Sequence, residues 1–431
     1  MSDIEIKMFP ASYGDSFLIT CKANKKTHIL VDMGFKSTYN KFIKKELEKL
    51  SETERLSLLV FSHIDEDHIL GGISFFEENG YSKNTNIIEI DEIWFNSYRH
   101  LKSQKNIIIE DEEQLSKIDN FLKNIIKKGH ARERGEPDLS NISAAQGITL
   151  ASLLYKNGYL DSWNKAYCHQ AVRVHKDDKG KLKSVCINDE VKLIVLSPTQ
   201  NDLEDLEKKW LDELKKMDPD DRSANKLMED AFEMYLATLQ EYEQKRRISK
   251  IASIEDNIED IADAPFVCDV SVVNRSSIAF VLEFYDKKLL FLADANPLTI
   301  EASLNEYLTM NQRHKQFFNA IKISHHGSKY NTSKSLLNKI ESDKYIISTN
   351  SRGRHKHPDI ETIFRIITSK TEYKKKLIFN YLPSNIFRRI NDDHLKKKYN
   401  YEIEYTNNLS ETNKVETTLI KIRDDLKVEN G

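Results

Sequence analysis

The sequence predicts a layered α/β protein, and three features lead to that prediction. Short apolar runs bounded by turn residues are typical of buried strands, and polar stretches with helical spacing separate them. Four of the runs lead toward histidine or aspartate at their C-terminal ends, which is where layered α/β proteins place their sites. The chain has 431 residues, more than one hydrophobic core usually holds, so we expect a large domain with insertions or two domains.

Strand-like runs cover residues 4–8, 15–21, 28–32 and 56–61, and a lysine-rich helix is expected over 37–51. The run at 56–61 is continuously apolar, as in a strand buried on both faces. Further strands are predicted at 92–95 and 191–196. Residues 1–202 are therefore expected to form the first part of the main domain.

The composition changes over residues 203–262, where mixed charges accompany Leu203, Leu206, Trp210 and Leu214 at helical spacing, with a break at Pro219. We expect a helical insertion there, serving as a lid, a protein-partner surface or a solvated appendage. A stripe within it is formed by Phe232, Tyr235, Leu236 and Leu239. It is predicted to seal a helical hairpin.

Strand character returns at residues 271–284, 288–292, 320–324 and 345–348, within a second part of the main domain over 263–376. A C-terminal extension over 377–431 carries possible strands at 377–381 and 401–405. This extension carries no recognisable motif.

Charge and composition exclude some classes of protein. The formal net charge is −3, with 39% hydrophobic and 31% charged residues, so the chain is neither a globally basic nucleic-acid binder nor an acidic disordered protein. A basic leader with a long apolar run is missing at the N-terminus, which favours a soluble, cytoplasmic protein without membrane contact. The cysteines form no CxxC pair and are expected to be buried thiols; they are Cys21, Cys168, Cys186 and Cys268.

The strongest motif is His63-Ile64-Asp65-Glu66-Asp67-His68, which follows the predicted strand 56–61. Two histidines and two aspartates crowd into one short loop. Imidazole and carboxylate groups are the usual ligands of Zn²⁺ and of harder ions such as Mn²⁺. The alternative is a solvated acidic turn.

Three later segments repeat the pattern of a strand that ends in candidate ligands. Asp294 follows strand 288–292, the His325-His326 pair follows strand 320–324, and His357 lies beyond strand 345–348. For Asp294 the alternative is an ordinary strand-ending turn. For His357 it is a polar loop.

The motif from His63 to His68, followed by Gly71-Gly72, resembles the signature of the metallo-β-lactamase superfamily. The resemblance implies an αββα sandwich, here with a helical insertion. It also implies that His63 and Asp65 bind one metal ion and that Asp67 and His68 bind a second. Asp65 stands where the commonest signature has a histidine, and this extra oxygen ligand weakens the case for zinc over manganese.

The same resemblance implies roles for the later segments. Asp294 would bridge the two ions, each of its oxygens reaching one of them. His325 would complete the second site, with His326 as a supporting or phosphate-contacting alternative. His357 would close the site near the scissile group.

One strand of the signature departs from the usual pattern, because residues 269–278 offer Asn274 and no histidine. This resembles the subgroup that contains the hydrolase domain of the competence-type DNA-uptake channel. In that subgroup Asn274 would replace a ligand or support it through a water. The cofactor implied is Zn²⁺ or Mn²⁺, as one ion or two.

A metal-dependent hydrolase follows from these ligands, because a bound cation activates water and polarises a phosphoryl or carbonyl oxygen. A phosphodiesterase or nuclease acting on nucleic acid or a nucleotide is favoured by the resemblance. Asp67 would hold the water, and His326, His357, Lys329 or Arg354 would meet phosphate oxygens. Two alternatives are a hydrolase of a small ester, lactone or thioester, and a scaffold or effector component of a multiprotein system such as antiviral defence.

Overall fold

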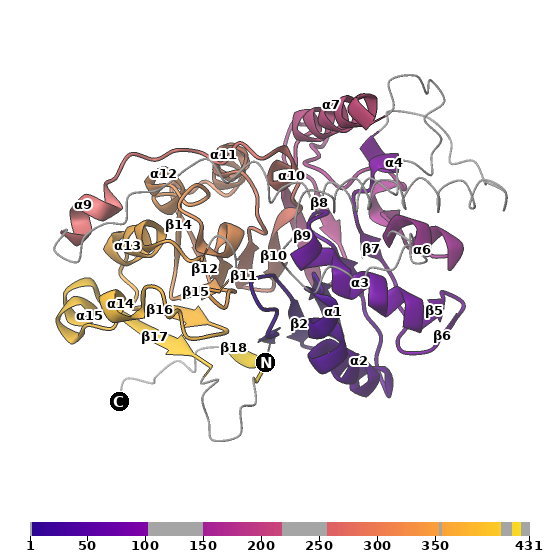
Figure 1. Cartoon of the computed structure of the whole chain (residues 1–431), viewed down its shortest axis with the longest axis horizontal. Helices are drawn as coiled ribbons and strands as arrows, with labels where there is room; N and C mark the ends of the chain where they lie inside the picture. Colours follow the sequence, from indigo (N-terminus) through magenta and orange to yellow (C-terminus); the bar gives the residue numbers. More distant parts are fainter. Residues whose placement is uncertain (1, 102–149, 218–256, 353–355, 407–415, 424–431) are drawn as a thin grey trace.

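The structure is a computed structural model that describes residues 2–101, 150–217, 257–352, 356–406 and 416–423 (Figure 1). It confirms the α/β prediction. Two large mixed sheets pack face to face in the middle of the molecule, and helices flank them on both sides (Figure 1).

The first sheet has six strands in the order β18-β1-β2-β3-β4-β7. Strands β1 to β3 form an antiparallel meander, and β4 and β7 add in parallel. Their bounds are Asp3–Met8 for β1, Phe17–Lys22 for β2, Lys26–Val31 for β3, Leu58–Val60 for β4, Ile93–Trp94 for β7 and Thr418–Ile422 for β18. The strands predicted over the first 61 residues are therefore present, with β4 shorter than expected.

The second sheet has eight strands in the order β17-β16-β15-β13-β11-β10-β9-β8. From β11 to β17 neighbouring strands run parallel, so their C-terminal ends meet at one edge. The bounds are Ser184–Cys186 for β8, Val191–Ser197 for β9, Ala279–Phe284 for β10, Lys287–Phe291 for β11, Ala320–Lys322 for β13, Lys344–Ile347 for β15, Lys375–Phe379 for β16 and Tyr401–Tyr405 for β17.

The strand predicted over 271–284 is wrong in its first half. Residues Val272–Arg275 form the short helix α10, and the strand begins only at Ala279. The Ser271 hydroxyl accepts a hydrogen bond from the Asn274 backbone N–H, which caps this helical turn. This local cap outweighs the β-branched residues that made the segment look extended.

Helices cover the outer face of each sheet. Over the first sheet lie α1 (Lys36–Thr38), α2 (Lys44–Ser51), α3 (Glu66–Asn79), α4 (Tyr98–Leu101), α6 (Leu150–Lys156), α7 (Gln200–Met217) and α10. A π-helical turn, Tyr39–Ile43, joins α1 to α2, so the helix predicted over 37–51 is present. Over the second sheet lie α9 (Ile258–Ala262), α11 (Pro297–Met310), α12 (Lys334–Leu337), α13 (Ile360–Thr368), α14 (Phe387–Ile390) and α15 (Asp393–Tyr399).

Three apolar clusters hold these layers together. One lies between the two sheets and contains Ile6 and Val60 of the first and Phe280 and Ile346 of the second. The other two lie between each sheet and its helices. Burial of both faces explains the continuously apolar strands seen in the sequence. Two small two-stranded sheets complete the described fold; they pair β5 (Gly80–Tyr81) with β6 (Asn84–Thr85) and β12 (Gln316–Phe318) with β14 (Ile340–Ser342).

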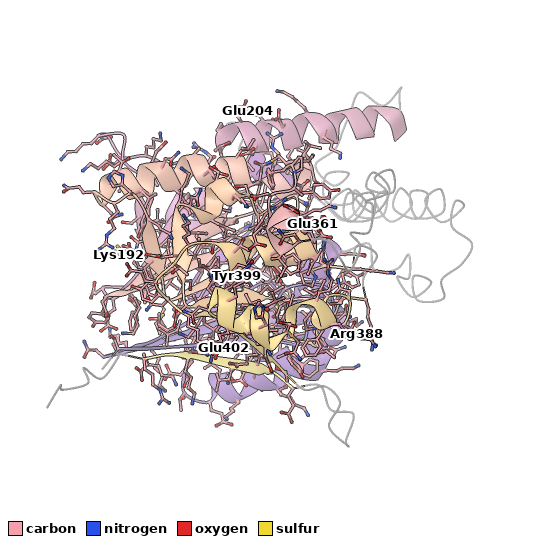
Figure 2. The ribbon with its side chains drawn as sticks, turned by 90° about the vertical axis from the view of Figure 1, so that its left-hand side faces the viewer. Lys192, Glu204, Glu361, Arg388, Tyr399 and Glu402 are labelled. Atoms are coloured by element: carbon pink, nitrogen blue, oxygen red, sulfur yellow. The ribbon has the colours of Figure 1, made fainter. Side chains whose placement is uncertain are left out.

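The C-terminal segment joins both sheets. Strand β16 crosses the boundary that we placed at residue 376, and β17 pairs with it at the edge of the second sheet. Strand β18 pairs with β1 in the first sheet, with Ile4 opposite Ile422. Figure 2 shows Tyr399 of α15 and Glu402 of β17 on the side of the molecule that faces the viewer.

The predicted helical insertion is described at its two ends only. Helix α7 anchors to the first core through Leu203 and Leu206, which are buried. Helix α9 packs in the second core. Residues 218–256 lie outside the described residues, and with them lies the predicted stripe formed by Phe232, Tyr235, Leu236 and Leu239.

The prediction that all four cysteines are buried is partly wrong. Cys21 is buried in β2, but Cys168 and Cys186 are exposed and Cys268 is half-buried. The exposed pair lies in a turn and on the edge strand β8, where little chain covers them. Among the described helices, none is both long enough and apolar enough to cross a membrane.

Candidate metal centre

The motif loop leaves the first sheet at the end of β4 and enters helix α3. Asp65 is the N-cap residue of α3, but its side chain makes no capping hydrogen bond. Its Oδ2 atom instead lies 3.2 Å from His63 Nε2. The first turn of α3 then carries Asp67 and His68 back over the end of the sheet.

The facing residues come from the second sheet. Asp294 follows β11, and the His325-His326 pair follows β13, its parallel neighbour. Both histidines have a left-handed backbone, with φ of 47° and 53°, a conformation that costs energy in residues other than glycine. This tight reversal points two successive imidazoles into the same site.

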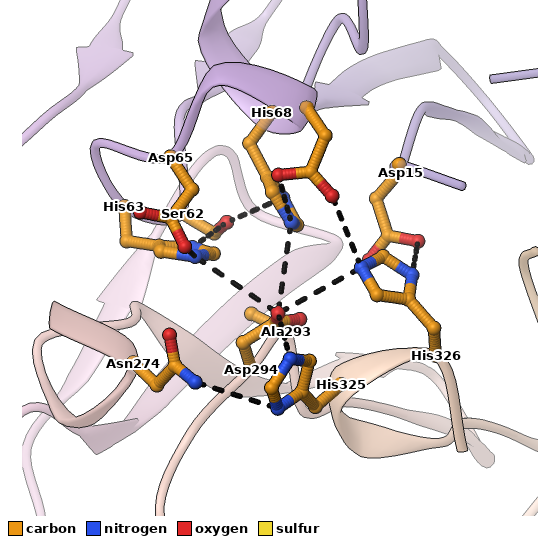
Figure 3. Close-up of polar contacts among 12 residues, drawn as sticks. Asp15, Ser62, His63, Asp65, His68, Asn274, Ala293, Asp294, His325 and His326 are labelled. Atoms are coloured by element: carbon orange, nitrogen blue, oxygen red, sulfur yellow. Dashed lines mark hydrogen bonds and ion pairs between the residues drawn. The ribbon is translucent and has the colours of Figure 1, made fainter. Parts of the chain in front are cut away.

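Four imidazole rings converge on one oxygen atom of Asp294 (Figure 3). The distance from Asp294 Oδ2 to the ring Nε2 atom is 3.6 Å for His325, 3.7 Å for His326, 3.8 Å for His68 and 4.0 Å for His63. These separations are too long for hydrogen bonds. They suit atoms that share a cation, because ligands at about 2.1 Å from a tetrahedral metal stand about 3.4 Å apart.

The Nδ1 atom of each of these rings, which points away from Asp294, lies within hydrogen-bond distance of an oxygen atom. His68 Nδ1 donates to Asp32 over 2.8 Å, His326 Nδ1 to the Ser348 carbonyl over 2.9 Å and His325 Nδ1 to Asn331 Oδ1 over 3.0 Å. His63 Nδ1 lies 3.0 Å from the Ser62 hydroxyl. A proton held at Nδ1 leaves the Nε2 lone pair for a metal.

The atoms that face the centre lack hydrogen-bond partners. Three of them are buried imidazole nitrogens: His63 Nε2, His68 Nε2 and His326 Nε2. Leaving so many buried polar atoms unsatisfied costs free energy unless another group meets them. The donor set of imidazoles and carboxylates fits a divalent cation such as Zn²⁺ or Mn²⁺.

The carboxylates divide the centre into two sides. Asp65 stands beside His63 on one side. On the other, the two oxygens of Asp67 lie 3.8 Å from His68 Nε2 and 3.4 Å from His326 Nε2. The structure thus puts His326, rather than His325, next to the predicted second-site residues.

A compact group on that second side meets the geometry of a metal site by itself. One ligand atom from each of its residues lies within 4.8 Å of the others, and the members are Asp15, His68, Asp294 and His326. All four are buried. Three of these residues were predicted as site residues, and Asp15 was not.

Without a cation the carboxylates attract protons to the rings. Burial alone lowers the pKa of His326, but the charges of Asp15 and Asp294 outweigh burial and raise it to about 10. Burial is likewise outweighed at His325, where Asp294 and Asp269 raise the pKa to about 9. The Asp294 carboxyl is buried, yet the neighbouring rings hold its pKa well below the ordinary value. A bound cation would displace these protons.

Asn274, the predicted substitute ligand, lies beside His325. Its Nδ2 atom donates to Asp269 Oδ2 over 2.7 Å and lies 3.4 Å from His325 Nδ1. Asn331 Nδ2 also donates to Asp269, over 3.1 Å. Asn274 therefore belongs to the polar groups that lie around the Nδ1 atom of His325.

His357 reaches the same end of the site, with its ring centroid 5.2 Å from that of His325. Burial lowers the pKa of His357 despite the nearby Asp359. Lys329, proposed as a phosphate contact, forms an ion pair with Glu361 at 3.0 Å. Arg354 lies outside the described residues.

Sequence reasoning missed several residues that shape the centre. Asp15 precedes β2, Asp32 follows β3, Ser62 precedes the motif and Lys322 ends β13. A single lysine within the apolar run Ala320-Ile321-Lys322-Ile323 was a usable signal, because a buried lysine needs a partner. The aspartates carry no such local mark, since strand-ending aspartates are common in turns.

No family model matches the chain, and a search of curated proteins finds no significant match.

Proposed function

We propose that this chain is a metal-dependent hydrolase of metallo-β-lactamase-like αββα architecture that cleaves phosphodiester bonds. The observation that carries the proposal is the convergence of four imidazole Nε2 atoms on Asp294 Oδ2, with a further carboxylate on each side. The two sheets between helical layers support the architecture.

Two groups of side chains would hold cations. His63 and Asp65 form one group, and Asp67, His68 and His326 form the other, with Asp294 between them. Divalent ions at such sites lower the pKa of water and stabilise negative charge on a phosphoryl oxygen. A pair of cation sites favours phosphodiesters, whose attacking and leaving oxygens both need stabilisation.

We assign the handling of water and protons to two residues. Asp67 has 16% of its side chain exposed, more than His68 or Asp294, so it can accept a hydrogen bond from an entering water. His357 has a lowered pKa, so near neutral pH it is an uncharged imidazole able to exchange a proton at the site.

The experiment is a substrate panel with purified protein loaded with Mn²⁺ or Zn²⁺. Single- and double-stranded DNA, RNA, cyclic nucleotides, bis(p-nitrophenyl) phosphate and a set of lactones and thioesters would be compared. We expect phosphodiester cleavage that is lost in Asp294→Asn. Asp91→Asn is the matched control, because Asp91 is exposed and pairs only with surface Arg55 among the described residues.

Two results would reject the proposal in different ways. Cleavage of lactones or thioesters without any phosphodiester cleavage would favour the small-substrate hydrolase. Failure of both ions to raise the melting temperature, together with no turnover, would favour a scaffold that uses the fold without its metal.

A further inference from the structure

Lys322 is a buried lysine beside the candidate metal centre that the proposed reaction does not use. It is the last residue of β13, and only 1% of its side chain is exposed. Because side chains alternate along a strand, Lys322 shares a face with Ala320, which packs between the two sheets. Its ammonium group therefore points toward the first sheet.

The Lys322 ammonium contacts groups from both sheets. It forms an ion pair with Asp15, from the loop before β2. It also donates to the Ala293 carbonyl over 3.1 Å and lies 3.8 Å from Asp294 Oδ1. A single cation thus contacts one candidate ligand directly and approaches a second.

These contacts divide the two oxygens of Asp294. Oδ1 faces Lys322, whereas Oδ2 faces the four imidazoles. The expectation that each oxygen reaches a different ion does not match this orientation. With Lys322 in place, Asp294 offers a single oxygen to the centre.

Asp15 extends the influence of Lys322 to the second side of the centre. One oxygen of Asp15 meets the lysine, and the other lies 3.3 Å from His326 Nδ1. The Asp15 backbone N–H also donates to the Asp67 carbonyl over 3.3 Å. The lysine therefore stands at the back of a group that includes a carboxylate and an imidazole of the site.

We propose that Lys322 is a positioning residue that acts as a resident cation. It holds Asp15 beside His326 and Asp294 in its ligand position before metal arrives, and it limits Asp294 to one ligand oxygen. This inference rests on the proposed metal centre. The competing explanation is a salt bridge that simply ties the two sheets together.

The two explanations differ in how metal changes the effect of removing the charge. A resident cation matters most when metal is absent, because bound ions can compensate the carboxylates afterwards. A purely structural salt bridge between the sheets stabilises the folded protein equally with and without metal. The loss of melting temperature caused by the substitution, measured once without metal and once with metal, therefore separates the two explanations.

The test is thermal unfolding of the full chain as wild type, Lys322→Met and Lys322→Arg, in EDTA and in saturating Mn²⁺. We expect Lys322→Met to melt about 3 to 5 °C below wild type in EDTA, with most of that deficit recovered in Mn²⁺. By linkage, the same variant should bind Mn²⁺ at least about tenfold more tightly in a titration. Lys322→Arg keeps the charge and should show the smaller metal-free deficit.

Lys287→Met is the matched control, because Lys287 is also a buried lysine of the second sheet, with 2% of its side chain exposed, and pairs with Asp286. The melting temperature of Lys287→Met should lie below that of wild type by the same amount with and without Mn²⁺. An equal deficit for Lys322→Met in both conditions, or no tighter Mn²⁺ binding, would overturn the inference. If Lys322→Met does not fold in EDTA but folds in Mn²⁺, the inference is supported. A wild type that Mn²⁺ does not stabilise would instead reject the proposed metal centre.

Discussion

The Asp32 carboxylate lies 2.8 Å from His68 Nδ1 and holds that ring with its Nε2 atom toward Asp294. Asp32 also accepts hydrogen bonds from the backbone N–H and the hydroxyl of Ser62, both at 2.7 Å. The aspartate thus connects the end of β3 to the residue that opens the motif loop. A carboxylate behind a ligating imidazole fixes its tautomer and raises its basicity.

Replacing Asp32 with asparagine should therefore weaken metal binding without removing a ligand. We expect the Mn²⁺ or Zn²⁺ affinity of Asp32→Asn to fall about 10- to 100-fold, measured by calorimetric titration of metal-free protein. Asp91→Asn is the surface control. Unchanged affinity in Asp32→Asn would mean that His68 is not a ligand or does not need this support.

Alanine substitutions at His357 and His326 should separate an effect on proton transfer from an effect on metal binding. His326 Nε2 lies among the candidate ligands, whereas His357 contacts the ring of His325 from outside the group. We expect His326→Ala to lose bound metal by elemental analysis. His357→Ala should keep the metal and lose about 10²- to 10⁴-fold in turnover. A loss of metal from His357→Ala would place that residue among the ligands instead.

The close approach of α3 to the first sheet requires glycine at position 71. A Cβ atom there would stand 2.1 Å from the Met33 carbonyl oxygen, and the Gly71 N–H donates to the Gly34 carbonyl over 2.8 Å. Gly71→Ala should therefore lower the free energy of unfolding by about 3 kcal/mol and, by moving the start of α3, weaken metal binding.

Gly180→Ala is the comparison for that variant. A Cβ atom at Gly180 meets no atom within 4 Å, although its φ is +72°. Only backbone strain of about 1 kcal/mol is expected, with metal affinity unchanged. Equal losses in urea unfolding for the two variants would contradict the close contact between α3 and Met33.

Stability should fall in mild acid because of His28 in β3. Burial lowers the pKa of His28 to about 4 from the ordinary 6.5. The unfolded chain then binds this proton more readily than the folded chain, so the contribution is complete above about pH 6.5 and declines as the pH falls toward 4. We expect a loss of about 2 kcal/mol across that range.

His28→Gln removes this titration and should flatten the pH dependence of urea unfolding between pH 7 and 4.5. Glutamine retains a polar group near Thr20, whose hydroxyl lies 3.1 Å from His28 Nδ1. Measurements in EDTA keep metal binding out of the comparison. If wild type and variant lose stability in parallel, the acid sensitivity arises elsewhere.

Local sequence patterns predicted most of the candidate site residues that the second sheet contributes. Asp294, the His325-His326 pair and His357 each follow a strand, and β11, β13 and β15 are parallel neighbours. The C-terminal ends of parallel neighbours meet at one edge, so reading strand ends was enough to group these residues. The α/β class followed from the same apolar runs.

Local sequence patterns gave wrong predictions where a helix-capping hydrogen bond or the solvent exposure of a side chain depended on the tertiary structure. The turn capped by Ser271 replaced the start of an expected strand, and Cys168 and Cys186 proved exposed. Hydrophobicity and β-propensity describe a residue's average environment. They do not report a single hydrogen bond or the edge of a sheet.

By itself, the sequence determined which chemical groups the candidate centre contains and that the loop from His63 to His68 is its densest part. Only the tertiary structure decided what surrounds that loop. It packed the first sheet against the second, so that Asp15 and Asp32 met candidate ligands distant in sequence and Lys322 came close to one oxygen of Asp294. The physical reason is that periodicity encodes which residues are buried along each strand. The pairing of side chains across two packed sheets depends on the three-dimensional fit of the whole core.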